Sequence, residues 1–357
     1  MLAITHADAL GGTGGATTIA DGAALNISGG ITTAAEGITI SGTGISSTGV
    51  IRNTSGNNTY SGAITLGSTS TIVSTGGAQT ISAAINGGSG LTITANGNLV
   101  VSGAVGGSTA LSAYAVTTTG SGTQTFSANV TTTGNQTYTA AGGIVTSGAR
   151  TFTSNSGTVN FVSALSGDNN VTVTGNADID GAITDIAVLS ITGTANIGAD
   201  ITSSDTQTYG DAVTLSANTT LTTSSDIVTF SDTVNSADST NRNLTVTTGG
   251  NTVHINFDGI VGGSQGVGAI ALTGVLDLNA AIADANSLTV SGVSLLDADI
   301  TTSGTQTYSA AITLGTAART LEGSTIQTTT INGAQNLAIT GNLDLNGIIG
   351  GSSAIGV

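Results

Sequence analysis

Cysteine, proline, tryptophan and lysine are all absent from this chain of 357 residues. Without cysteine the chain has no disulfide bonds and no thiol chemistry. The lack of proline suits stacked β-strands, because a proline removes a hydrogen bond from the strand ladder. Aromatic residues make up 3% of the chain, too few for the cores of an array of β-sandwich domains. No run of about 18 apolar residues is present, so the sequence predicts no transmembrane helix.

Positive charge is also scarce, because four arginines stand against 20 acidic residues and the net charge is −16. Binding to nucleic acid needs clustered lysine and arginine, so we expect no nucleic-acid partner. Direct binding to anionic lipid is disfavoured for the same reason, and we expect no membrane insertion. An acidic surface without lysine fits a solvated extracellular or cell-surface location. It equally fits a high-salt habitat.

Both ends of the sequence read as interior pieces of a repeat. Residues 1–30 lack the basic and apolar regions of a signal peptide. The chain ends in a Gly-Gly-Ser pattern at 350–352, whereas the same pattern at 262–264 runs on into more strand-like sequence. We therefore expect residues 1–357 to form one continuous piece of a longer repeat protein.

One phrase recurs along the chain, in which Thr-Gln-Thr is followed by an aromatic residue, small residues and an alternation of apolar residues with threonine. Its aromatic positions, with one degenerate copy, are predicted structural repeat positions: Tyr60, Phe126, Tyr138, Tyr209 and Tyr308. Spacings of 21 residues separate Tyr60 from Ile81 and Tyr209 from Phe230, and spacings of 20 residues separate Leu189 from Tyr209 and Leu288 from Tyr308. A longer shift of 99 residues relates the last two blocks.

The pattern within each repeat is that of short strands. Segments such as 171–174 and 244–247 alternate apolar and polar residues with a period of two, and glycine, asparagine and aspartate separate them. No segment has the apolar stripe of an amphipathic helix. The sequence therefore predicts an all-β fold, a parallel and right-handed β-helix (solenoid) with coils of about 20–21 residues.

Enzymatic chemistry is not predicted. Asp178 with Asp180, and Asp297 with Asp299, have the spacing that would place two carboxylates on one strand face, as glycosidases require. The acid–base partners are missing, because the chain has two histidines and no lysine. The Gly-x-Ser-x-Gly pattern at 262–266 lacks the helix and the partners of a nucleophile elbow, and it is expected by chance among 54 glycines.

Calcium is the only metal that the sequence suggests, and no other cofactor is predicted. Asp178, Asp180 and Asp185 are weak candidate ligands, because calcium prefers carboxylate and carbonyl oxygens. The calcium-binding nonapeptide is absent, and solvated aspartates in turns explain the same residues. Glycosylation sequons are frequent, for example at Asn57, Asn129, Asn135, Asn218 and Asn243, but asparagine and threonine are so common that most need no explanation.

Pairs of threonine raise the alternative of an ice-binding solenoid, since a flat rank of threonines can order water. The candidate pairs are Thr92 with Thr94, Thr172 with Thr174, and Thr245 with Thr247. An ice-binding face needs such a pair at the same position in every coil. The position of these pairs within the repeat changes along the chain.

The phrase Gly-x-Gln-Thr-Tyr-x-x-Ala-Val/Ile-Thr-Leu resembles the repeats of filamentous haemagglutinin-like adhesins of Gram-negative bacteria, with copies at 123–131, 206–215 and 305–314 and weaker echoes along most of the chain. The resemblance implies a right-handed parallel β-helix that is exported through an outer-membrane transporter and acts in cell-surface attachment or biofilm. The Asn-Pro motif of that family's secretion domain is absent. No catalytic or binding residue carries over.

Two functions therefore stand beside the ice-binding alternative. The first is a non-catalytic extracellular shaft of a bacterial adhesin, whose partners are glycans or proteins on host or neighbouring cells. The second is a self-assembling extracellular filament or sheath, in which open strand edges pair end to end.

Overall fold

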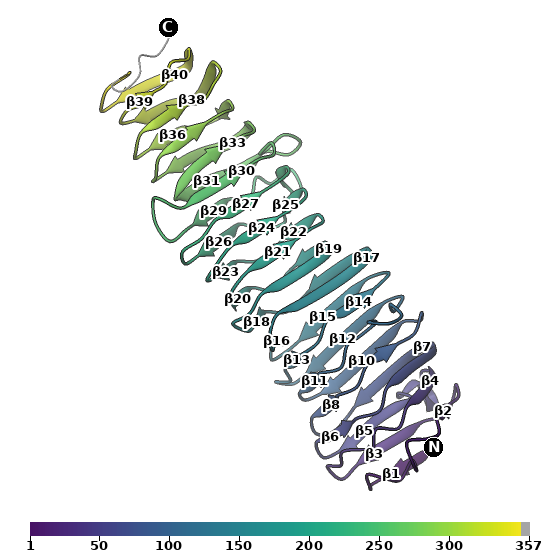
Figure 1. Cartoon of the computed structure of the whole chain (residues 1–357). Coiled ribbons are helices and arrows are strands. Elements are labelled where there is room, and N and C mark those ends of the chain that lie inside the picture. The colour runs from purple at the N-terminus through teal and green to yellow at the C-terminus, as the bar shows by residue number, and fades with distance from the viewer. Residues whose placement is uncertain (351–357) are drawn as a thin grey trace. The chain divides into compact units, whose positions relative to one another are not determined.

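A computed structural model describes residues 1–350, and nearly all of its regular structure is β-strand (Figure 1). Strands pair in parallel and stack as a β-solenoid of about 16 turns, which confirms the predicted all-β, parallel solenoid. The chain divides into two compact units, the first formed by Met1–Gly181 and the second beginning at Ala182. The single continuous solenoid expected for the whole chain, and its handedness, stay predictions.

The first unit contains a short 3₁₀ turn, η1 (Ile45–Ser47), and these strands: β1 (Leu2–Ile4), β2 (Thr17–Ile19), β3 (Leu25–Ser28), β4 (Ile38–Gly42), β5 (Ile51–Ser55), β6 (Asn58–Tyr60), β7 (Ile64–Ser74), β8 (Gln79–Ile81), β9 (Ile85–Asn86), β10 (Leu91–Asn96), β11 (Leu99–Val101), β12 (Tyr114–Thr119), β13 (Gln124–Phe126), β14 (Val130–Thr132), β15 (Gln136–Ala140), β16 (Ile144–Thr146), β17 (Arg150–Phe161), β18 (Leu165–Ser166) and β19 (Val171–Ile179).

The second unit, as far as Gly350, contains these strands: β20 (Ile183–Ile186), β21 (Leu189–Ile191), β22 (Ala195–Ile197), β23 (Ile201–Ser203), β24 (Gln207–Tyr209), β25 (Val213–Leu215), β26 (Thr219–Thr223), β27 (Val228–Phe230), β28 (Val234–Ser236), β29 (Leu244–Thr247), β30 (His254–Phe257), β31 (Val267–Thr273), β32 (Val275–Leu278), β33 (Ile282–Val290), β34 (Ser294–Leu296), β35 (Ile300–Thr302), β36 (Thr305–Tyr308), β37 (Ile312–Leu314), β38 (Arg319–Thr328), β39 (Ile331–Asn332) and β40 (Leu337–Leu345).

Each coil contains three strand positions, one on each side of the solenoid. The chain then returns to the first side, where the next strand pairs with the strand of the preceding coil. In the first unit, for example, the chain runs through β6, then both halves of the long strand β7, and returns to pair β8 with β6. Inward and outward residues alternate along most strands, as the burial of β6 and β8 illustrates. A narrow apolar core therefore runs through each unit, enclosed by three sides.

Coil length varies more than the sequence predicts. The register pairs Tyr60 with Ile81, as their spacing in the sequence predicts. Tyr209, however, pairs with Ile191 and not with Leu189, so this coil is shorter than predicted. Phe230 pairs with Phe257 in the next step, which makes a coil that is longer than predicted. The predicted coil length therefore holds for some coils only, because loops at the corners add or remove residues without disturbing the strands.

The longer shift between the two repeated blocks does not correspond to a whole number of coils. Tyr209 belongs to an inward ladder that continues through Phe230 and Phe257. Tyr308 belongs to another inward ladder, in which Leu272 pairs with Val290 and Val290 pairs with Tyr308. The repeated phrase thus occupies different sides of the solenoid. It can do so because all three sides present the same environment, with one inward and one outward row of side chains.

All ten aromatic residues of the chain lie in the core and are at most 2% exposed. The five predicted repeat positions are among them, but they do not form one column. Tyr60 and Phe126 share the ladder of β6, β8, β11 and β13, whereas Tyr138 lies in β15 on another side of the first unit. In the second unit the rings of Tyr209, Phe230 and Phe257 stack directly on one another.

The repeated glutamine explains why the phrase recurs. Gln207 is fully buried, and its amide oxygen accepts a hydrogen bond from the hydroxyl of Tyr209 at 3.0 Å. Its amide nitrogen donates to the carbonyl oxygen of Thr222 in the next coil at 2.9 Å and to the hydroxyl of Ser203 at 3.2 Å. The same arrangement joins Gln136 to Tyr138, Thr153 and Thr132, and Gln306 to Tyr308, Glu322 and Thr302. We call this arrangement of a buried glutamine, the tyrosine two residues later and a Ser or Thr hydroxyl the corner lock, because its hydrogen bonds join one coil to the next.

The lock is incomplete where no tyrosine follows the glutamine. Gln79 and Gln124 are fully buried too, but the residues two positions later are Ile81 and Phe126. The amide oxygens of both glutamines are buried without a hydrogen-bond partner. Since a buried acceptor without a donor costs free energy, the tyrosine hydroxyl is a stabilising part of the complete lock.

Candidate functional site

The three aspartates considered as calcium ligands are divided between the two units of the chain. Asp178 lies at the outer face of β19 and Asp180 just beyond its end, both in the first unit, whereas Asp185 lies in β20 of the second unit with a φ of 52°. Within residues 1–350, no three side chains of His, Asp or Glu come together in a way that could hold a metal ion. Calcium binding by these three aspartates stays a prediction.

The second pair of aspartates, Asp297 and Asp299, makes contacts that hold neighbouring coils together. Asp297 lies 3.6 Å from the guanidinium of Arg319. Asp299 accepts a hydrogen bond from the backbone N–H of Thr320 at 2.8 Å. Both contacts join successive coils, so a structural role accounts for these carboxylates.

The Gly-Gly-Ser pattern at 262–264 is a recurring loop of the solenoid. Gly262 has a φ of 73°, and the backbone N–H of Ser264 donates to the side-chain oxygen of Asn235 at 3.0 Å. In the other unit, Gly106 has a φ of 70° and the N–H of Ser108 donates to Asn86 at 2.9 Å. Glycine is needed at this position because its φ is positive. The copy at 350–352 lies almost wholly outside the described residues.

The frequent sequons have a structural origin. Asn129 stands at a corner, and its side-chain oxygen accepts a hydrogen bond from the backbone N–H of Thr151 in the next coil at 3.0 Å. Equivalent bonds join Asn57 to Ala78, Asn135 to Thr158, Asn218 to Asn243, and Asn243 to Ala269. An inward residue and an outward threonine follow each of these corner asparagines, so the coil geometry itself produces Asn-x-Thr.

The three candidate threonine pairs lie in β10, β19 and β29. Thr245 and Thr247 continue a rank of the second unit, because they pair with Thr220 and Thr222 of the preceding coil. In the following coil Ala271 takes the place of one threonine. Paired threonines therefore extend over only two successive coils here, which is short for a face that must match an ordered lattice of water.

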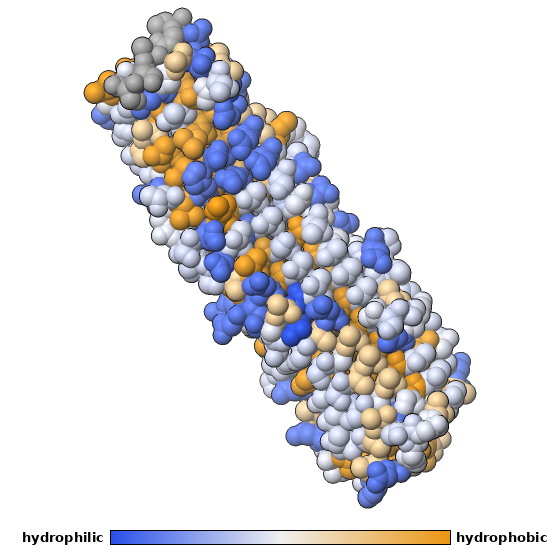
Figure 2. Space-filling model, in the orientation of Figure 1, coloured by the Kyte–Doolittle hydropathy of each residue, from blue (hydrophilic) through white to orange (hydrophobic). Residues whose placement is uncertain are grey.

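The outer surface offers few groups for strong recognition. Figure 2 shows a visible face mostly of intermediate hydropathy, as glycine, threonine and serine produce, with scattered polar and apolar areas. No aromatic ring is available to stack on a ligand, since all ten are buried. Candidate binding residues therefore act without aromatic stacking.

One polar hollow combines such groups in the first unit. Its volume is about 260 Å³, and the lining residues are Asn135, Gln136, Thr137, Thr158, Asn160 and Asp178. It lies on the outer side of β15, β17 and β19, where Thr137, Asn160 and Asp178 follow one another on successive coils. Among these residues, the sequence singles out Asp178 as a candidate ligand and Asn135 as a sequon. The others give no separate signal, because asparagine and threonine occur throughout the chain.

No protein-family model, no curated protein and no solved structure matches this chain. Within residues 1–350, no helix is long and apolar enough to cross a membrane.

Proposed function

We propose that this chain is a non-catalytic, extracellular structural segment of a bacterial surface protein, of the filamentous haemagglutinin-like type, that carries an adhesive region away from the cell. The observation that supports the proposal most is the use of the polar side chains. Buried glutamines such as Gln207, the corner asparagines and the aspartates of the second pair make contacts between coils. In such a chain, the polar side chains mainly serve to hold neighbouring coils together.

The acidic surface and the absence of cysteine are consistent with a location outside the cell. The buried aromatic side chains fit a spacer better than a strong binding tip, because large exposed aromatic side chains commonly anchor tight interfaces. The proposed partners, glycans or proteins on other cells, would then be bound mainly by parts of a longer protein beyond the repeats described here.

Labelling of intact source cells tests this function. Antibodies raised against the purified chain are expected to label unpermeabilised cells, and deletion of the coding segment is expected to reduce attachment of the cells to surfaces. Antibodies against a cytoplasmic protein, which must label only permeabilised cells, are the control. Labelling of this chain only after permeabilisation would contradict an extracellular role.

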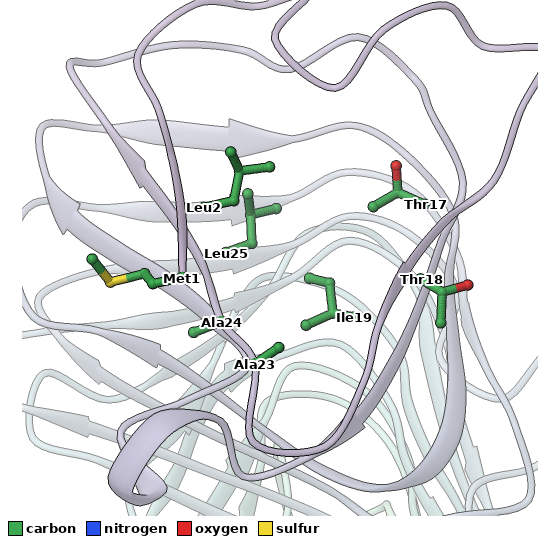
Figure 3. Close-up of a pocket in the computed structure, with 8 residues that line it drawn as sticks. All are labelled: Met1, Leu2, Thr17, Thr18, Ile19, Ala23, Ala24 and Leu25. Carbon is green, nitrogen blue, oxygen red and sulfur yellow. The ribbon is translucent and has the colours of Figure 1, made fainter.

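A second candidate, end-to-end assembly into a filament, is favoured by the N-terminal coil. A pocket of about 350 Å³ opens there, lined by Met1, Leu2, Thr17, Thr18, Ile19, Ala23, Ala24 and Leu25. Figure 3 shows Leu2 next to Leu25, with Ile19 across the pocket. Leu2 pairs with the buried Leu25 and is nevertheless 52% exposed. A second copy of the chain that packs over this pocket would cover the exposed apolar side chain of Leu2.

Electron microscopy of the purified protein separates the two candidates. Assembly predicts long fibres of constant width, which Leu2→Asp abolishes because it places a charge in the end pocket. Ile45→Asp is the matched control, because Ile45 is exposed in the loop that contains η1 and does not line the pocket. Single particles at all protein concentrations, or fibres that persist in Leu2→Asp, would exclude assembly through this pocket.

A further inference from the structure

The chain offers few bonds to proteases that cleave after basic residues. It has no lysine, and its arginines are Arg52, Arg150, Arg242 and Arg319. A protease of trypsin specificity takes the basic side chain into a pocket and attacks the carbonyl group of the peptide bond that follows, most easily in an exposed loop. The surroundings of these four bonds therefore decide whether such a protease can cut the folded chain.

Three of the arginines occupy the same place in a coil, directly before a residue whose backbone is bonded to the preceding coil. The backbone N–H of Thr151, which follows Arg150, donates to the side-chain oxygen of Asn129 at 3.0 Å. Equivalent bonds join Asn243, which follows Arg242, to Asn218 at 2.9 Å, and Thr320, which follows Arg319, to Asp299 at 2.8 Å. The nitrogen atom of each bond that would be cut is therefore already held by a corner side chain.

Other contacts hold the arginines themselves. The guanidinium of Arg150 donates to the carbonyl oxygen of Ser147 at 3.1 Å. The guanidinium of Arg319 donates to the carbonyl oxygen of Leu296 in the preceding coil, also at 3.1 Å. Arg52 lies within β5, which pairs with β3 on one side and β7 on the other. Neither the side chains nor the backbone of these residues are free to enter a protease without a local opening of the stack.

Arg242 is the most exposed case, because it lies in the loop of residues 237–243. Its backbone N–H donates to the hydroxyl of Ser236 at 2.9 Å, and its carbonyl oxygen accepts the N–H of Gly268 in the next coil at 2.7 Å. Its guanidinium lies 3.4 Å from the carboxylate of Asp238. The peptide bond after Arg242 is thus fixed to the preceding coil by its nitrogen and to the next coil by its oxygen.

We propose that the folded chain withstands proteases of trypsin specificity because neighbouring coils hold each of the four bonds that they could cleave. Cleavage then requires a coil to detach from its neighbours, and its rate follows the small population of that open state. The property suits an extracellular spacer that must keep its length, but it does not depend on that role. Each of these corner side chains therefore protects one particular bond as well as joining two coils.

Digestion of the full chain with trypsin, followed by mass spectrometry of the intact products, tests the proposal. The parent chain is expected to remain uncut under conditions that convert Thr240→Arg to the fragments 1–240 and 241–357. Thr240 lies in the same loop as Arg242, but its backbone N–H donates within the loop, to Asp238 at 2.7 Å. An arginine at this position therefore presents a bond that no neighbouring coil holds through this N–H.

Removal of a single corner side chain tests the mechanism. Asn218→Ala leaves the backbone N–H of Asn243 without its partner, so cleavage after Arg242 is expected to accelerate about fivefold, as the loss of one hydrogen bond implies. Asn218→Asp is the matched control and should stay resistant, because Asp299 is the acceptor at an equivalent corner.

The position of the new cleavage decides the result. Faster cleavage of Asn218→Ala confined to the bond after Arg242 supports the proposal. Cleavage of the parent as fast as that of Thr240→Arg overturns it, and so does resistance of Thr240→Arg or equal cleavage of both Asn218 variants. If Asn218→Ala is cut after all four arginines because it unfolds, Asn129→Ala decides instead, since it should affect only the bond after Arg150. Surface labelling of cells is independent of these results, so protease resistance can fail while the structural role stands.

Discussion

Phe230→Ala is expected to lower the stability of the second unit by about 3–5 kcal/mol, the usual cost of removing a buried phenylalanine ring. Phe230 is fully buried between two parallel rings. Its ring centroid lies 5.2 Å from that of Tyr209 and 4.9 Å from that of Phe257. Alanine would leave a cavity in the middle of this stack, and both neighbouring rings would lose a stacking contact.

Hydrogen exchange with mass spectrometry measures this effect where it occurs. Coils of a solenoid contact only their neighbours, so protection should fall in residues 205–260 and be kept in the strands β6–β11 of the first unit. Phe230→Leu is the control, because Leu278 and Leu296 occupy the same ladder in later coils, and its loss should be clearly smaller. Equal loss of protection in both units would show that the stack is not a local source of stability.

Tyr138→Phe is expected to destabilise the first unit by about 1–3 kcal/mol, although it removes a single oxygen atom. The Tyr138 hydroxyl donates to the buried amide oxygen of Gln136 at 2.7 Å. Phenylalanine keeps the packing of the ring, whose centroid lies 5.2 Å from that of Phe126. The variant therefore leaves Gln136 in the incomplete state that Gln79 and Gln124 already show.

Tyr114→Phe provides the matched control for this prediction. Tyr114 lies close to Tyr138, with 6.0 Å between ring centroids, and it is equally buried. Burial raises the pKa of both tyrosines far above the usual range, so both hydroxyls are neutral in the folded chain. The Tyr114 hydroxyl, however, has no hydrogen-bond partner. Denaturant titration should show Tyr114→Phe at least as stable as the parent, and equal losses in both variants would refute the corner lock.

The sequence could predict the class of fold because the relevant signals are local. The alternation of apolar residues and threonine in segments such as 171–174 and 244–247 requires a strand with one buried face. The recurrence of Thr-Gln-Thr-Tyr requires a repeated environment. The structure adds that Tyr209 and Tyr308, which belong to this phrase, are buried in the core.

Coil length was predicted only in part, because it depends on the corners. The spacing between Tyr60 and Ile81 agrees with the register, whereas Leu189 was matched to Tyr209 in place of Ile191. Leu189 and Ile191 both point inward, so the wrong match keeps the inward and outward alternation and the sequence pattern alone does not detect it. Only the hydrogen-bonded pairing of the strands distinguishes the two alignments.

The candidate site required the tertiary structure for the same reason. By itself, the sequence determined an all-β, parallel solenoid with a threonine-rich exterior and an acidic, lysine-free surface. It singled out Asp178 as a candidate ligand and Asn135 only as a sequon, and it gave no signal for Asn160. Asn135 stands at a corner, and Thr137, Asn160 and Asp178 meet on successive coils because the loops give those coils unequal lengths. Which outward residues become neighbours is decided by loop lengths that follow no fixed period, and so by the folded register alone.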